Sequence, residues 1–113
     1  MSVQPGQHNI SVQRRADYDL QLQFKDSTGA GINLTGWTAY AQAWNVGRTV
    51  KYADFAVSYT NRTTGSISIA LTDAQTTTLP DEAFYDVLLE DTNGLRNYYL
   101  EGIMYVSQGY TAP

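Results

Sequence analysis

Three groups of residues in this 113-residue chain could in principle do acid–base or metal chemistry, and the first is a lone histidine. His8 lies near the N-terminus, and the sequence has no cysteine. A zinc site or a Ser-His-Asp triad needs more nitrogen or thiolate groups than one histidine supplies. We therefore expect no metal, no cofactor and no nucleophilic centre, and we interpret His8 as an exposed polar side chain.

The second group is a set of closely spaced acids, Asp81, Glu82 and Asp86. Paired carboxylates are the machinery of glycoside hydrolases, so an enzyme is one alternative. Asp81 and Glu82, however, follow Pro80 in a predicted turn, whereas Asp86 stands between two apolar residues of a predicted strand. We interpret Asp86 as an inward-leaning structural acid that pairs with an arginine or a backbone group, and we expect no enzymatic activity.

The third group, Asp91-Thr92-Asn93-Gly94, resembles the start of a calcium-binding loop. Such a loop needs a glutamate at its twelfth position. Counted from Asp91, that position is Gly102. An Asn-Gly pair tolerates the positive φ angles of a tight hairpin, so this segment predicts a β-turn between two strands.

The charge distribution bears on the class of partner. The formal net charge is −4, from 7 basic and 11 acidic residues, and the basic residues are scattered along the chain. A nucleic-acid-binding surface needs a cluster of positive charge, so we expect no nucleic acid partner and read the basic residues as solvated surface charges. No apolar run approaches the ~20 residues of a membrane span, and the N-terminus lacks the features of a signal peptide.

The aromatic content is the feature most relevant to binding, with 9 tyrosines and 2 tryptophans. Tyrosine and tryptophan fill sandwich cores, and they are also enriched at protein interfaces and sugar-binding surfaces. Tyr98 and Tyr99 are neighbours on a predicted strand, so one of them should face outward. The candidate interface residues are Val3, Pro5, Ile10, Trp44, Tyr52, Tyr59, Tyr98 and Tyr110. A carbohydrate platform of Trp44, Tyr40 and Tyr52 is the alternative use of these rings.

The elements that must position these side chains are β-strands. Apolar residues alternate with polar ones over residues 17–25, 37–44 and 66–71, and more weakly over 49–59; a period of two is typical of half-buried strands. Residues 84–90 are apolar on both faces, which predicts a central strand. Residues 95–106 form a further strand, in which Gly102 indicates a bulge or a close backbone approach.

One segment breaks the strand pattern. Thr72 and Gln75 form a capping-box spacing, which predicts one or two helical turns over residues 73–78, followed by Leu79 in the core. About seven strands with regularly spaced turns predict an all-β fold, an immunoglobulin-like antiparallel β-sandwich. We expect an extended N-terminal arm over residues 1–9, the sandwich over 10–106 and a C-terminal tail over 107–113.

Short motifs recur in a recognisable order from Ile32 to Val106. They are Leu34-Thr35-Gly36, Leu71-Thr72, Leu79-Pro80, Tyr85-Asp86, Asn93-Gly94 and Gly102. With these motifs the chain resembles the N-terminal domain of the tailed-phage baseplate upper protein and related short phage tail proteins.

The resemblance implies a non-enzymatic virion structural protein, a tail, baseplate or fibre-adaptor component that acts through protein–protein contacts. Its partners would be other phage virion proteins and further copies of itself. It would be made in the host cytoplasm and end up in the virion. The alternative is a capsid decoration protein, or a carbohydrate-binding module displayed on the virion with a glycan as its partner.

Overall fold

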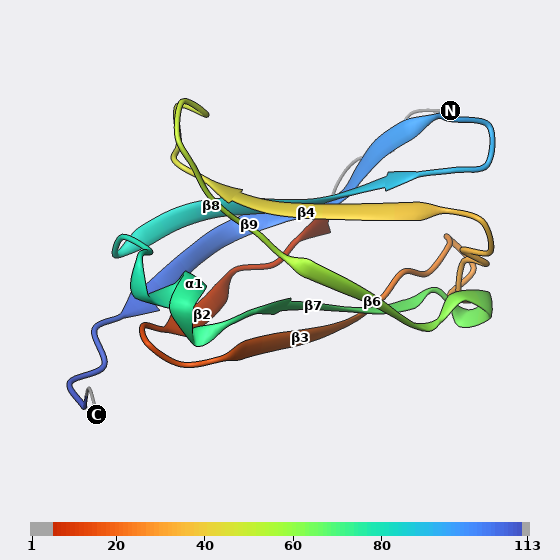
Figure 1. Cartoon of the computed structure of the whole chain (residues 1–113). Coiled ribbons are helices and arrows are strands. Elements are labelled where there is room, and N and C mark those ends of the chain that lie inside the picture. The colour runs from red at the N-terminus through yellow and green to blue at the C-terminus, as the bar shows by residue number, and fades with distance from the viewer. Residues whose placement is uncertain (1–5, 112–113) are drawn as a thin grey trace.

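Two β-sheets face each other in this structure, a computed structural model that describes residues 6–111 (Figure 1). The strands of the larger sheet are β1 (Gly6–Gln7), β2 (Ile10–Gln13), β4 (Thr38–Trp44), β5 (Lys51–Asp54), β8 (Glu82–Glu90) and β9 (Arg96–Ser107). Those of the smaller sheet are β3 (Tyr18–Gln23), β6 (Ala56–Asn61) and β7 (Ser66–Leu71). A 3-10 turn, η1 (Arg62–Thr64), and one short helix, α1 (Asp73–Thr77), complete the described elements.

The strand order identifies the architecture. The larger sheet runs β1-β9-β8-β4-β5, with β2 also on β9, and the smaller sheet runs β3-β7-β6. Pairs among β3 to β9 are antiparallel, whereas β1 and β2 lie parallel to β9. Strands that alternate between two facing sheets in this order form an immunoglobulin-like sandwich. The predicted fold class is confirmed.

The core lies between the inner faces of the two sheets. On β4 the alanines Ala39, Ala41 and Ala43 are buried, and their small side chains leave room for larger ones from the opposite sheet, such as Ile67 and Ile69. The alternation within β4 therefore assigns its small residues to the core and its larger ones to the other face. The predicted central position of β8 is confirmed, because it pairs with both β4 and β9.

The weak segment at residues 49–59 is two strands rather than one. β5 belongs to the larger sheet and β6 to the smaller sheet. Phe55 lies between them, is buried, and donates its backbone N–H to the carbonyl of Ala41 at 2.9 Å. The chain changes sheets at this residue, which explains why no single alternation runs through the whole segment.

The helical turn forms where the capping spacing predicts it. Thr72 Oγ1 accepts the backbone N–H of Gln75, and the Gln75 side chain accepts the backbone N–H of Thr72. These reciprocal bonds satisfy two backbone donors that a helix start otherwise leaves free. Leu79 then returns to the core, 3% exposed.

Gly102 marks a close backbone approach rather than the bulge. A Cβ at this position would overlap the carbonyl of His8, whose N–H donates to the carbonyl of Glu101 at 2.9 Å. Residues 6–9 of the expected arm thus run along β9, so this part of the arm is joined to the sheet. The irregularity in pairing lies instead at Val87/Leu88, where β9 carries one extra residue.

The turn that follows β2 is bonded to the segment before β8 and to the residue after β9. Arg14 donates to the carbonyl of Leu79, to Gln108 and to Asp81, and Arg15 donates to the carbonyl of Gln108. Strand β9 extends through Ser107, the first residue of the expected tail. The Arg14 side chain is only 13% exposed, so the interpretation of the basic residues as solvated surface charges is wrong for Arg14.

Candidate functional site

The side of the larger sheet that faces away from the core carries three cross-strand rows of side chains from β4, β8 and β9. Hereafter this surface is called the outer face. Its first row is Tyr40–Leu88–Tyr98, its second Gln42–Asp86–Glu101 and its third Trp44–Phe84–Ile103. Two rows of aromatic and aliphatic residues therefore flank a row of polar and acidic ones.

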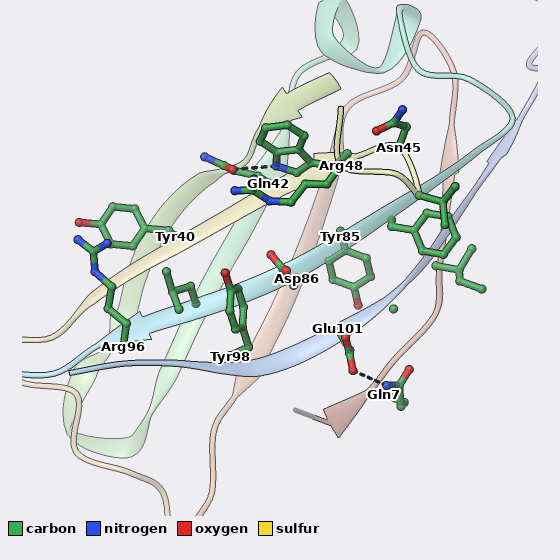
Figure 2. A pocket seen from close by; sticks show the side chains of 16 residues that line it. Gln7, Tyr40, Gln42, Asn45, Arg48, Tyr85, Asp86, Arg96, Tyr98 and Glu101 are labelled. Carbon is green, nitrogen blue, oxygen red and sulfur yellow. Dashed lines mark hydrogen bonds between the residues drawn. The ribbon is translucent and has the colours of Figure 1, made fainter. Parts of the chain in front are cut away.

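The outer face is hollowed rather than flat. A depression of about 730 Å³ lies over the three rows, and Gln7, Asn45, Val46, Arg48 and Arg96 contribute to its rim. Figure 2 shows Tyr40, Tyr98, Asp86 and Glu101 projecting into the space above β4, β8 and β9. A volume of this size lies within the range of ligand pockets, roughly 300–1,000 Å³.

Hydrogen bonds and stacking fix the rim. Trp44 Nε1 donates to Gln42 Oε1 at 2.9 Å, and the Arg48 guanidinium lies 4.7 Å from the centre of the Trp44 ring. Arg96 Nε donates to Glu90 at 2.8 Å, and its guanidinium lies 6.0 Å from the Tyr40 ring. Both arginines are thus already engaged with an aromatic ring or a carboxylate at the rim.

Asp86 lies on the outer face, which corrects the prediction that it leans inward. It alternates with the buried Tyr85 and Val87 and shares its side of β8 with Phe84 and Leu88. Within residues 6–111, no hydrogen bond or ion pair reaches its carboxylate. The predicted partner group is therefore not found there, and Asp86 is half-buried at the floor of the depression.

Burial raises the pKa of Asp86 above its ordinary value, and the charge of Glu101 raises it further. Arg48 acts in the opposite direction but does not cancel these two effects. Because the pKa of Asp86 is raised in the folded chain, its ionised form at neutral pH is destabilised relative to water. Glu101 differs in having a neutral partner, since Gln7 Nε2 donates to its carboxylate at 2.8 Å.

Two of the predicted interface residues, Trp44 and Tyr98, lie on the outer face. Tyr98 is 48% exposed, whereas its neighbour Tyr99 packs against Phe24 and Trp37 with ring centres 5.9 and 6.3 Å apart. The expectation that one of the paired tyrosines faces outward is confirmed. Tyr40 belongs to the same surface at 42% exposure.

The other predicted interface residues are dispersed. The prediction that Ile10 is an interface residue is wrong. Its side chain is only 5% exposed, because the parallel pairing of β2 with β9 turns it into the core. Tyr52 and Tyr59 are half-buried against the core, and Tyr110 is 94% exposed near the C-terminal end. Val3 and Pro5 lie outside the described residues. The proposed sugar platform of Trp44, Tyr40 and Tyr52 is not assembled, since Tyr52 does not line the depression.

The groups first considered for chemistry are spread over the molecule. Glu82 is exposed and faces Tyr105 on β9, Asp81 binds Arg14, and His8 is exposed. Asp91 instead closes the hairpin turn, where its side chain accepts the backbone N–H groups of Asn93 and Leu95. In the part of the chain that is described, no three His, Asp or Glu side chains gather as metal ligands would.

Tyr85 lies beneath the depression and joins the sheet to the N-terminal segment. Its ring is 3% exposed and its hydroxyl donates to the carbonyl of His8. Burial and, to a smaller extent, Tyr18 raise the pKa of Tyr85 to about 12. A phenol pKa that is raised by folding contributes stability below pH 10, and this contribution is lost as the pH rises through about 12.

Tyr85→Phe removes this hydroxyl without changing the packing of the ring. We expect the free energy of unfolding at pH 8 to fall by about 1–3 kcal/mol, because the carbonyl of His8 loses its donor. The wild-type chain should lose stability between pH 10 and 12 more steeply than the variant. Urea unfolding at both ends of this range measures the two effects, and equal pH profiles would contradict this role for Tyr85.

Comparisons with known proteins find similar solved structures but no sequence match. No protein-family model matches the sequence, and no curated protein sequence matches it. Among solved structures, one similar chain is described as the crystal structure of the Lin-41 filamin domain. It is 13% identical, with a TM-score of 0.49, over 88% of this chain and 84% of that one. No helix among the described residues is long and apolar enough to span a membrane.

Proposed function

We propose that this chain is a non-catalytic interaction module that binds a protein partner through its outer face, as a structural component of a phage tail, baseplate or fibre adaptor. The observation that carries the binding proposal is the pair of apolar rows on the outer face. The virion context rests on the sequence resemblance given above. Copies repeated around the particle, in contact with other virion proteins, would form the assembly.

The composition of the outer face supports a protein partner. Tyrosine, tryptophan and arginine dominate binding energy at protein interfaces, and here Tyr40, Tyr98, Trp44 and two rim arginines lie on one surface. Tyr40 and Trp44 belong to β4, Tyr98 and Arg96 belong to β9, and both strands are hydrogen-bonded to β8. A surface that is held in place before binding loses little entropy when it is covered.

A glycan is the second candidate ligand, since aromatic rings next to amide and carboxylate groups also suit sugars. The stacking surfaces argue against it. Arg48 already lies over Trp44, and Arg96 lies near the Tyr40 ring and is bound to Glu90. A sugar would have to displace these guanidinium groups before it could stack on either ring.

Leu88→Glu tests the protein-binding role, because Leu88 is central in the first row, between Tyr40 and Tyr98. Leu95→Glu is the matched control: Leu95 is 62% exposed in the hairpin turn and does not line the depression. Tagged copies of each chain would be expressed in infected cells and counted by mass spectrometry in gradient-purified phage particles.

We expect Leu88→Glu to reduce incorporation by about 30-fold or more, the factor that corresponds to a 2 kcal/mol contact, while Leu95→Glu stays near wild type. Circular dichroism would verify that both variants are folded. Absence of the wild-type chain from particles would refute the virion role. Equal incorporation of the two variants would refute the outer face as the binding surface.

A further inference from the structure

The middle row of the outer face contains an unfavourable pair of charges. Asp86 and Glu101 are directly opposed on the antiparallel strands β8 and β9. Side chains in such a pair have Cβ atoms about 4.5–5.5 Å apart, and like charges there destabilise the sheet. The chain retains two carboxylates side by side in the depression, the half-buried Asp86 and the exposed Glu101, and water screens the charge of Asp86 less than it would at an open surface.

The cations of the rim do not neutralise this pair. Arg96 is bound to Glu90 at 2.8 Å, and Arg48 stacks on Trp44. Glu101 receives only the neutral amide of Gln7. One further positive charge would therefore be favourable between Asp86 and Glu101.

The walls of the depression suit such a charge. The first row presents Tyr98 on one side of the carboxylates and the third row presents Phe84 on the other, and among the described residues no arginine stacks on either of these rings. A cation near aromatic rings gains about 0.5–2 kcal/mol in addition to its ion pairs. The apolar rows can also cover the aliphatic stem of a lysine or arginine.

We propose that the partner of the outer face inserts one basic side chain, a lysine or an arginine, between the two apolar rows and onto Asp86 and Glu101. This inference rests on the proposed function and specifies the chemistry of the partner. Charge complementarity selects this occupant. Asp86 and Glu101 are both acidic, the neighbouring arginines are engaged, and the whole chain carries a net charge of −4. A second copy of the chain would bring the same negative charge.

Synthetic peptides provide the probe. Four acetylated and amidated peptides of the sequence Gly-Ile-Ser-X-Ser-Ile-Gly would carry Arg, Lys, norleucine or Glu at X. Each would be titrated into the ¹⁵N-labelled full chain, and the shifts of the Asp86 and Glu101 amide signals would be followed. We expect the Arg and Lys peptides to bind at least about tenfold more tightly than the norleucine peptide, a difference of 1.4 kcal/mol, and the Glu peptide to bind least.

Asp86→Asn and Glu101→Gln should each remove this preference, whereas Glu82→Gln should keep it. Glu82 is a matched control, an exposed acid on the same strand that does not line the depression. Asp86→Asn should leave the melting temperature unchanged or higher, because it removes a like charge. A lower melting temperature would indicate a structural carboxylate and overturn the proposal.

The remaining outcomes separate this inference from the proposed function. Equal affinity for all four peptides, or no binding of any, would overturn the proposal that the partner inserts a basic side chain. If the chain forms concentration-dependent dimers and Leu88→Glu abolishes them, the outer face binds a second copy of the chain, and the proposal of a basic partner is overturned. If Leu88→Glu prevents incorporation into particles and Asp86→Asn does not, the outer face is still the interface but its partner is not basic. Reduced incorporation of Asp86→Asn supports the inference.

Discussion

Gly102→Ala is expected to destabilise the chain by about 3 kcal/mol, at the upper end of the effect of overpacking. The new methyl group would overlap the carbonyl of His8, and a backbone group cannot rotate away as a side chain can. Relief of the overlap must move the N-terminal segment from β9. This breaks the hydrogen bond from His8 N to Glu101 O and the contact of His8 with the Tyr85 hydroxyl.

Urea unfolding measures the loss, and the hydrogen exchange rate of the His8 amide reports on the N-terminal segment. Gly47→Ala is the matched control, since no atom lies within 4 Å of a Cβ built there. It should change stability by less than about 0.5 kcal/mol. A Gly102→Ala chain as stable as Gly47→Ala would contradict the close approach of residues 6–9 to β9.

Arg62→Met should cost about 2–4 kcal/mol, because two carbonyl groups lose a charged donor. Arg62 Nη1 donates to the carbonyls of Leu34 and Trp37 at 3.1 and 2.7 Å, and its guanidinium lies 3.6 Å from the Tyr59 ring centre. These contacts hold the segment that leads into β4. Methionine preserves much of the length of the side chain but supplies no donor.

Arg48→Met is the control for a stacked arginine at the rim, and we expect it to cost less than about 1 kcal/mol. Thermal and urea unfolding compare the two variants. If the two variants lose the same free energy of unfolding, Arg62 contributes no more stability than an exposed arginine, and its proposed role in holding the start of β4 is refuted.

The surroundings of the Arg62 and Asp86 side chains differ from those that the sequence predicts. The sequence predicts strands, the helical turn and the hairpin because their signals are local: alternation, a capping box and an Asn-Gly pair. The sequence predicts a solvated charge at Arg62, but its side chain is bonded to two carbonyls 25 and 28 residues away along the chain. No local pattern reports such a partner. Asp86 could have been placed outward, since its alternation with Tyr85 and Val87 indicates this.

The outer face itself depends on register between distant segments. Tyr40, Leu88 and Tyr98 become one row only through the pairing of β4 with β8 and of β8 with β9. The irregularity at Leu88 decides that Tyr98 rather than Tyr99 completes this row. A shift of one residue would exchange these two side chains between core and surface, and the sequence alone does not specify where the irregularity lies.

The central claim is that the outer face is covered when the chain is assembled, and hydroxyl-radical footprinting of the chain in purified phage particles tests it most directly. Labelling of free and assembled chain would be compared at Tyr40 and Tyr98, which are 42% and 48% exposed, with Leu95 at 62% as the internal reference. We predict that Tyr40 and Tyr98 are protected in the particle while Leu95 remains labelled. Unchanged labelling of both tyrosines in particle-bound chain would contradict the claim.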